Sequence, residues 1–486
     1  YIRENDLTTK TGLSSRTLTQ SLLMSTATPL IEDFGEEYGT GYYPVLRQGA
    51  GLANVGAAVS SGSYILMDAN ATDSYKDGKV KAELGEDADR TGLYTFGFTI
   101  YNMEDTATAF NLDADFFTQD VFTNYISDST TANFEDAWTT PIAANVSWDV
   151  DGKTIEVADA SGMEHCDFNG DGKINADDGQ ALLDYVTGVR AEINDKAYAD
   201  FSEDGDIDTY DAYLFFKRLG KSAVEVPANG SVHVTVTAQL SKAMLDMYDE
   251  ASDGTGTYVE GYVYASELAS AEGEEGTEHS IPVLGYYGSW TDGSMYDIGS
   301  YLEYANGLEN RVPYMYAAAS SNALKYQTLT VQYAGDSGLY YFGGNPYVEE
   351  DFYHEDRNAY NPDTTTFAKM YFSLIRNAAN VRMDITGDDG KEYLSKELNQ
   401  QATSAYYYTN GGTWQGTRSS LNFSAAPNAP EGTKLNISMT MAPEYYVDYS
   451  GETAVTDWDA LSDGATMSYV AYVDKTAPEV SEVYFK

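Results

Sequence analysis

The chain has 486 residues, enough for about three domains of ordinary size, and 42% of its residues are hydrophobic, so large cores can be buried. A formal net charge of -48 repels phosphate backbones and makes nucleic acid a poor partner, whereas it suits cations and solubility. The single cysteine, Cys166, excludes an internal disulfide, and the sequence has no apolar run of about 18 residues that would predict a membrane span.

The first 60 residues predict short helices. Ser14 or the serine after it can cap a helix in which leucines recur at helical spacing as far as Leu23. Pro29 ends this pattern. Residues 49–59 then predict a glycine turn that leads into a second, short apolar helix.

From about residue 62 the hydrophobic pattern changes to a period of two, as in 94–101 and 232–237. Such runs recur between clusters of Asn, Asp and Gly, a pattern typical of antiparallel sandwiches. Residues 268–279 are small and charged and predict a hairpin loop. In a second β block, roughly 300–480, we expect strands at 326–333, 369–375, 381–386 and 435–441.

Two acidic loops interrupt the β pattern, and each leads into a short helix. In both loops side-chain oxygens fall at positions 1, 3, 5, 9 and 12, with glycine at position 6. Oxygen ligands at this spacing wrap one hard cation, position 7 supplies its backbone carbonyl, and the glycine permits the sharp turn. Position 8 is isoleucine in both loops, Ile174 and Ile207, so the two side chains can pair. An acidic linker need not repeat these features in register. The loops and their helices are 167–178 with 179–187, and 200–211 with 211–219.

Residues 164–220 resemble a type I dockerin, a family that uses two loop–helix units to dock onto a cohesin domain. The resemblance implies two calcium ions. In the first loop it implies the ligands Asp167, Asn169, Asp171, Lys173 (through its carbonyl), Asn175 and Asp178. In the second loop it implies Asp200, Ser202, Asp204, Asp206 (through its carbonyl), Asp208 and Asp211.

A cohesin is a candidate partner, but this chain differs from the dockerin family at the residues that commonly recognise a cohesin. The family uses small hydroxyl pairs at loop positions 10 and 11, where this chain has Ala176-Asp177 and Thr209-Tyr210. The basic residues usual in the following helix are present only as Lys217 and Arg218. We therefore expect the insert to pack against its own sandwich as a calcium-stiffened spacer.

Other short words resemble subtilisin-like cell-envelope serine peptidases of the lactocepin and complement-cleaving type. Residues 20–60 resemble the end of the catalytic domain, through the words LLMSTA (22–27), RQGAG (47–51) and AAV (57–59). Words resembling the family's fibronectin-like domains follow in the same order: PANGS (227–231), YVEGYV (258–263), SIPVLGY (280–286), RNAAN (376–380) and DGK (389–391). Residues 473–480 resemble the junction to a further domain. Each of these sequence motifs is short, and the resemblance is carried by the order that they share with the family.

These resemblances imply a mainly β fold: tandem fibronectin type III-like sandwiches with a small α-helical, dockerin-like, calcium-binding insert. The implied domains are a catalytic-domain remnant at 1–61, a first sandwich at 62–163 plus 221–298, the insert at 164–220 and a second sandwich at 299–486. The implied role is the post-catalytic accessory region of a bacterial subtilisin-like serine endopeptidase, extracellular and either secreted or cell-wall attached. Its partners would be the upstream catalytic domain and the protein substrate.

No catalytic triad is visible in the chain itself. A subtilisin-type site needs a serine nucleophile, a histidine base and an aspartate that orients the histidine. The sequence contains no Gly-Thr-Ser-Met-Ala run, and none of the four histidines lies in a His-Gly-Thr context. We expect His233 and His279 to be structural and the triad to lie upstream of Tyr1, in a longer protein.

Two other readings stay open. A dockerin-bearing, carbohydrate-binding protein of a cellulosome-like assembly would use tyrosine runs such as 406–408 with Trp414 as a sugar platform, although packing within a sheet is the simpler explanation. A surface adhesin with calcium-stiffened β domains is the other. The carboxylates at 349–351 and 355–356 beside His354 fit a solvated acidic loop better than a catalytic pair.

Overall fold

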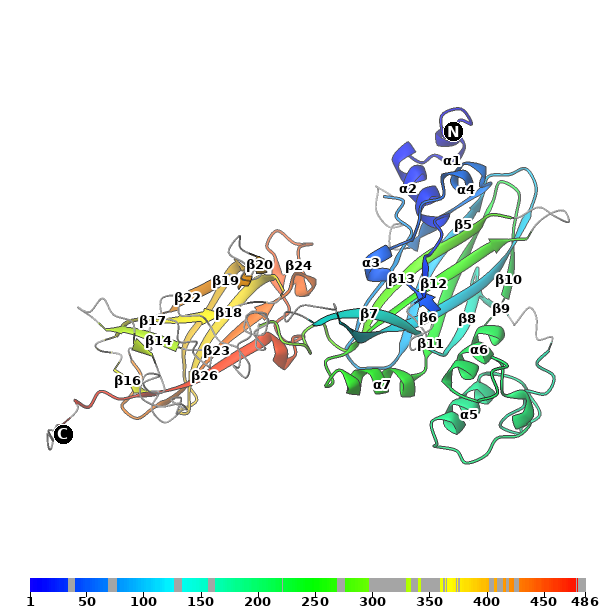
Figure 1. Ribbon diagram of the computed structural model, residues 1–486. Coiled ribbons are helices and arrows are strands. Elements are labelled where there is room, and N and C mark those ends of the chain that lie inside the picture. The colour runs from blue at the N-terminus through cyan, green and yellow to red at the C-terminus, as the bar shows by residue number, and fades with distance from the viewer. Residues whose placement is uncertain are drawn as a thin grey trace. The chain divides into compact units, whose positions relative to one another are not determined.

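The protein is largely β, with a small helical insert (Figure 1). The computed structural model forms two compact units, one made of Tyr1–Tyr125 with Asn133–Trp290 and one that begins at Thr291. No helix among the described residues is long and apolar enough to cross a membrane. The described residues are 1–33, 40–68, 77–125, 133–155, 162–220, 222–268, 276–296, 329–333, 340–341, 359–361, 363, 365–372, 374, 376–401, 406–408, 414–416, 419–423, 428–477 and 479.

Two sheets form the body of the first unit. One sheet has the order β10-β6-β12-β13-β4 with β7 paired to β6, and the other has the order β3-β5-β11-β8-β9. The strands of the first sheet are β4 (Ala82–Asp87), β6 (Thr108–Tyr125), β7 (Asn133–Pro141), β10 (Ser222–Val226), β12 (Thr257–Glu267) and β13 (Glu278–Tyr287). Those of the second are β3 (Ser63–Met67), β5 (Leu93–Asn102), β8 (Ala144–Val150), β9 (Lys153–Ile155) and β11 (Ser231–Leu240).

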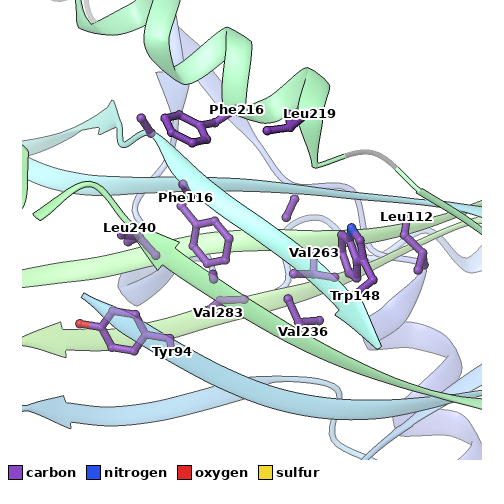
Figure 2. Packing of buried hydrophobic residues seen from close by; sticks show 14 of the residues in the cluster. Tyr94, Leu112, Phe116, Trp148, Phe216, Leu219, Val236, Leu240, Val263 and Val283 are labelled. Carbon is purple, nitrogen blue, oxygen red and sulfur yellow. The ribbon is translucent and has the colours of Figure 1, made fainter. Parts of the chain in front are cut away.

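The period-two patterns become strands that bury alternate side chains. Along β11, Val232, Val234 and Val236 are buried while the residues between them are half-exposed. They share one core with residues of the other sheet, among them Phe116 and Val263 (Figure 2). The hairpin predicted around 268–279 is confirmed, because β12 and β13 pair antiparallel from Thr257 opposite Tyr287 to Ser266 opposite Glu278.

The N-terminal residues pack onto this sandwich. The helix predicted after Ser14 is confirmed, since the Ser14 hydroxyl accepts the Thr17 N–H at 3.0 Å. Leu18 and Leu22 are buried together with Tyr64 of β3. The elements here are α1 (Leu7–Thr11), α2 (Ser15–Ser25), β1 (Ile31–Asp33), β2 (Thr40–Tyr42), α3 (Val45–Gln48) and α4 (Val55–Ser60).

The predicted glycine turn before α4 depends on Gly51. Its φ is +97°, and a Cβ added there would lie 2.2 Å from the Thr28 carbonyl oxygen. A buried carboxylate holds the preceding helix: Glu260 of β12 accepts the Val45 N–H at 2.7 Å. Burial raises the pKa of this carboxyl above its ordinary value, and hydrogen bonds from Gln119 and Val45 oppose that rise.

His279 joins three elements in the interior of the first unit. It lies in β13 with no exposed surface, and its two ring nitrogens contact the Ser63 Oγ at 2.7 Å and the Ser25 Oγ at 2.9 Å. The histidine is structural, as predicted. Burial lowers the pKa of its imidazole from 6.5 to about 4, so the folded protein holds the neutral ring.

Acid should therefore weaken the first unit through His279. The stability that depends on the neutral, buried His279 is fully present above pH 6.5, near the pKa of this histidine in the unfolded chain. It is lost as pH falls toward 4, at about 1.4 kcal/mol per pH unit. At pH 5 the loss relative to pH 7 is about 2 kcal/mol. Urea unfolding at both pH values should show a smaller loss for His279→Gln, which keeps a donor and an acceptor for the two serines. An equal loss in both proteins would contradict this role.

The helical insert interrupts the first unit between β9 and β10 (Figure 1). Its helices are α5 (Ala176–Val186), η2 (Lys196–Tyr198) and α6 (Thr209–Leu219). A further helix, α7 (Lys242–Ala251), connects β11 with β12. Both insert helices begin two or three residues earlier than the predicted 179–187 and 211–219, because the loop residues themselves cap them.

The second unit contains two larger sheets, ordered β15-β14-β17-β22 and β16-β26-β23-β18-β19. Met295 and Tyr296 are buried in its core, and the Tyr296 hydroxyl donates to the Met439 carbonyl at 2.5 Å. The strands are β14 (Leu329–Tyr333), β15 (Tyr340–Tyr341), β16 (Ala359–Tyr360), β17 (Thr365–Phe372), β18 (Ala378–Gly387), β19 (Glu392–Gln401), β20 (Tyr406–Tyr408), β21 (Trp414–Gly416), β22 (Ser419–Phe423), β23 (Lys434–Ala442), β24 (Val447–Asp448), β25 (Val455–Thr456) and β26 (Thr466–Val473).

Each strand predicted in this block overlaps an observed one, namely β14, β17, β18 and β23. The tyrosine run 406–408 forms β20 and pairs with β21, so that Tyr408 stands opposite Trp414. The carboxylates predicted to form an acidic loop at 349–351 and 355–356, and His354 beside them, lie outside the described residues.

Candidate calcium loops in the helical insert

The two acidic loops share the hydrogen bonds that close them. In each, the carboxylate at position 1 accepts the N–H of the glycine at position 6: Gly172 to Asp167 at 2.9 Å, and Gly205 to Asp200 at 3.0 Å. Both glycines have positive φ, +83° and +98°, with open space where a side chain would stand. Each loop therefore wraps around the carboxylate at its own position 1, and both do so in the register that the sequence predicts.

The carboxylates at position 12 close the loops. Asp178 and Asp211 have no exposed surface. Asp178 accepts N–H groups from positions 3 and 9, Asn169 at 3.1 Å and Asn175 at 2.9 Å. Asp211 does the same with Ser202 at 2.9 Å and Asp208 at 2.8 Å. Aspartate is thus long enough to bridge both sides of each loop.

Positions 9 and 12 also start the helices. The Asn175 side chain accepts from the Asp177 N–H at 2.7 Å, and the Asp208 side chain accepts from the Tyr210 N–H at 2.7 Å. Each forms a reciprocal capping box with the aspartate three residues later. The loop and the first turn of its helix are therefore one hydrogen-bonded structure, a role that the sequence analysis missed although the Asn/Asp-x-x-Asp spacing signals it.

The residues present fit a calcium ion. All the donors that the register implies are oxygens of carboxylates, amides, one hydroxyl and backbone carbonyls, the set that hard cations prefer. No three His, Cys, Asp or Glu side chains gather tightly enough anywhere in the described chain to hold a metal by themselves. Ile174 and Ile207 are half-buried and pack against the core of the first unit.

The insert packs directly on the sandwich through α6. Phe216 and Leu219 are nearly buried and face the sheet that carries Trp148 (Figure 2). The Trp148 indole N–H donates to the Gly220 carbonyl at 2.5 Å, just past the end of the helix. On the other side of Phe216 lies Gly179 of α5, where an added Cβ would stand 2.3 Å from the phenyl ring. One apolar core therefore runs from the sandwich into the insert.

Asp115 of β6 receives polar contacts from three residues on two other elements of the first unit, β2 and α6. Its carboxylate is only 4% exposed. It accepts hydrogen bonds from Tyr42 at 2.8 Å and from Tyr213 of α6 at 2.6 Å, and Lys217 of α6 forms an ion pair with it. Burial, and then the neighbouring Asp115 charge, raise the pKa of Tyr213 far above its ordinary value. This junction was not foreseen from the sequence.

The other side chains that could take part in chemistry, two histidines and the cysteine, have structural contacts instead. His233 contacts Asp68 at 2.8 Å, and His165 stacks on Tyr198 with ring centroids 4.5 Å apart. Cys166 is buried, and desolvation raises the pKa of its thiol to about 11, so it is protonated at neutral pH. None of these arrangements has the geometry of a nucleophile beside an activated base.

Comparison with known proteins connects the insert to one family and the chain to a group of proteinases. The Dockerin type I domain family matches residues 164–220, the segment that contains both loops. The match supports calcium binding in general and an extracellular setting.

A PI-type proteinase of Lactococcus lactis subsp. cremoris is 24% identical over 223 residues, which are 42% of this chain and 10% of that protein. A PII-type proteinase of Lacticaseibacillus paracasei is 25% identical over 209 residues, 40% of this chain and 9% of that protein. The chain thus spans about a tenth of the length of these relatives. A class 5 fimbriae chaperone, CfaA, aligns over 80% of this chain and 96% of its own, with 8% identity and a TM-score of 0.17. The chain is therefore similar to bacterial proteinases over part of its length and contains a segment of the dockerin type I family.

Proposed function

We propose that this chain is the post-catalytic accessory region of a secreted, subtilisin-like serine endopeptidase of the bacterial surface. The observation that carries the proposal is the similarity to PI-type and PII-type proteinases over about 40% of the chain. The ordered words from LLMSTA at 22–27 onward add to it, because they point to the end of a subtilisin-like catalytic domain. The catalytic domain and the protein substrate of the parent are the partners in this proposal.

The proposed organisation follows the sequence: a catalytic-domain remnant at 1–61, a fibronectin-like sandwich split by the insert at 164–220, and a second fibronectin-like sandwich that ends the chain. The packing of α2 against β3, with Leu18 and Leu22 beside Tyr64, supports a rigid transition from the remnant to the first sandwich. Such a platform would hold and space the catalytic domain, which is the accessory role proposed here.

The insert is proposed to bind two calcium ions, one in each loop. The residues that would hold them are the two sets of six predicted from the sequence, including the Lys173 and Asp206 carbonyls. Calcium would supply the positive charge that offsets the crowded carboxylates. The chain's own residues fix the loops: Asp178 and Asp211 bridge them, and Asn175 and Asp208 start the helices.

The proposal predicts that residues 1–486 alone cleave no peptide bond, because the triad is expected in the part of the parent that precedes Tyr1. Purified chain incubated with casein should leave it intact. The longer parent protein should cleave casein, lose activity with a serine-directed inhibitor, and carry an Asp…His…Gly-Thr-Ser order before residue 1. A parent without that order, or inhibitor-sensitive turnover by the pure chain, would overturn this assignment.

A second function has one specific observation in its favour. The dockerin match at 164–220 also suits a subunit of a cellulosome-like assembly that docks onto a cohesin. Against it, Tyr213, Phe216 and Lys217 of α6 are already engaged by the sandwich. Capture of the intact chain by cohesins at submicromolar affinity, lost on chelation, would favour this alternative.

A further inference from the structure

We propose that Asp115, a residue of the sandwich, controls the calcium affinity of the second loop in the insert. The inference rests on the proposed calcium site and goes beyond it, because Asp115 belongs to neither loop. In this proposal, calcium binding at the second loop is thermodynamically coupled to the sandwich, whereas calcium binding at the first loop is largely independent of Asp115.

Helix α6 connects the two sites physically. Its first turn is built by Asp208 and Asp211, which are positions 9 and 12 of the second loop. One and two turns further on, Tyr213 and Lys217 both contact the buried Asp115 carboxylate. Just past the helix, the Gly220 carbonyl accepts from Trp148. The helix that presents two calcium ligands is therefore held by the sandwich along its length.

The first loop provides an internal contrast. Its helix, α5, packs against α6 through Gly179 and Phe216. Among the described residues, no hydrogen bond or ion pair joins a side chain of α5 to a strand of the sandwich; Gln180 instead donates to Asp184 within the helix. Among the described residues, the polar side-chain contacts between an insert helix and the sandwich strands therefore come from the second loop–helix unit.

The coupling follows from the difference between the second loop without calcium and the same loop with calcium bound. Without a cation, the carboxylates of the second loop repel one another and loosen the loop. A sandwich that holds α6 in place keeps Asp208 and Asp211 in position and reduces the ordering that calcium must impose. Linkage is reciprocal, so calcium in the loop also strengthens the contact with Asp115. Couplings of this kind change affinity by about 5- to 150-fold.

The test is a calcium titration of the chelated full chain by calorimetry. In an Asp171→Ala background the second loop is the remaining site, and adding Asp115→Ala should weaken its affinity by about tenfold or more. In an Asp204→Ala background the first loop remains, and Asp115→Ala should change its affinity by less than about threefold. Asp115→Asn, which keeps the shape and one of the two oxygens that accept from Tyr42 and Tyr213, should give a smaller shift and guards against misfolding.

The matched control is Asp249, another nearly buried carboxylate of the first unit with a basic partner. It lies in α7, is 9% exposed, and accepts from Arg90 at 2.7 Å and from the Gly256 N–H at 2.7 Å. Asp249→Ala should destabilise the unit without moving the affinity of the second loop. Wild-type affinity in the Asp115 variants, or an equal shift in the Asp249 variant, overturns the coupling. A wild-type chain that binds no calcium at all overturns the calcium assignment itself, together with this inference.

Discussion

Asp211→Ala is expected to abolish calcium binding at the second loop and to reduce the stoichiometry of the chain from two ions to one. In the absence of calcium, the same change should also destabilise the insert. It leaves three N–H groups without their acceptor, those of Phe201 at 2.8 Å, Ser202 at 2.9 Å and Asp208 at 2.8 Å. An unsatisfied buried donor costs about 1–3 kcal/mol, and because these three are part-buried, a total loss of about 3 kcal/mol is expected. Calorimetric titration measures the stoichiometry, and urea unfolding in chelator measures the stability.

Asp206→Ala is the matched control, because it removes the same charge from the same loop. Asp206 occupies position 7, where the ligand is the backbone carbonyl, and its side chain is exposed. Its N–H already bonds to Asp204 at 2.9 Å, and an alanine keeps that bond. The control should therefore bind two ions with slightly weaker affinity. Two ions bound by the Asp211 variant, or an equal loss in the control, would show that local charge rather than loop closure governs binding.

The sequence predicts the geometry of the two acidic loops well because everything that this geometry needs is local. The ligand register, the glycine at position 6 and the helix that follows all lie within about 20 residues, and the same pattern occurs twice. The ligand register alone predicts the helix starts two or three residues late, because Asn175 and Asp208 each also cap a helix. The period-two runs likewise predict β5 and β11, since alternation decides which side chains reach the core.

The contact between insert and sandwich could not be predicted from the sequence. Asp115 and Lys217 are 102 positions apart, and a strand pattern says which face is buried but not which helix covers it. From the sequence, Lys217 resembles the basic residues that dockerins commonly place in this helix. The structure instead pairs it with Asp115, because the buried carboxylate needs a positive partner. Charge placement of this kind depends on the tertiary arrangement, which local patterns do not encode.

Phe216→Ala should destabilise both the insert and the sandwich. Phe216 is 5% exposed and lies against Gly179 of α5. It also belongs to the core that contains Trp148 of the sandwich (Figure 2). Truncation of a buried phenylalanine costs about 3–5 kcal/mol, through lost burial and the cavity left behind. Because the core is continuous, the loss should appear as faster amide exchange in α6 and also in β8 and β11.

Hydrogen exchange measured by mass spectrometry, in saturating calcium, separates this outcome from its alternative. Val189→Ala serves as the control, since that side chain is 78% exposed in the same insert and its truncation should change stability by less than about 0.5 kcal/mol. If Phe216→Ala accelerates exchange only in α5 and α6 while β8 and β11 keep their protection, the insert is a separate cooperative unit that merely rests on the sandwich. Faster exchange on both sides would mean that the sandwich draws part of its stability from a helix whose first turn is a calcium loop, so that calcium in the insert stiffens the β unit that surrounds it.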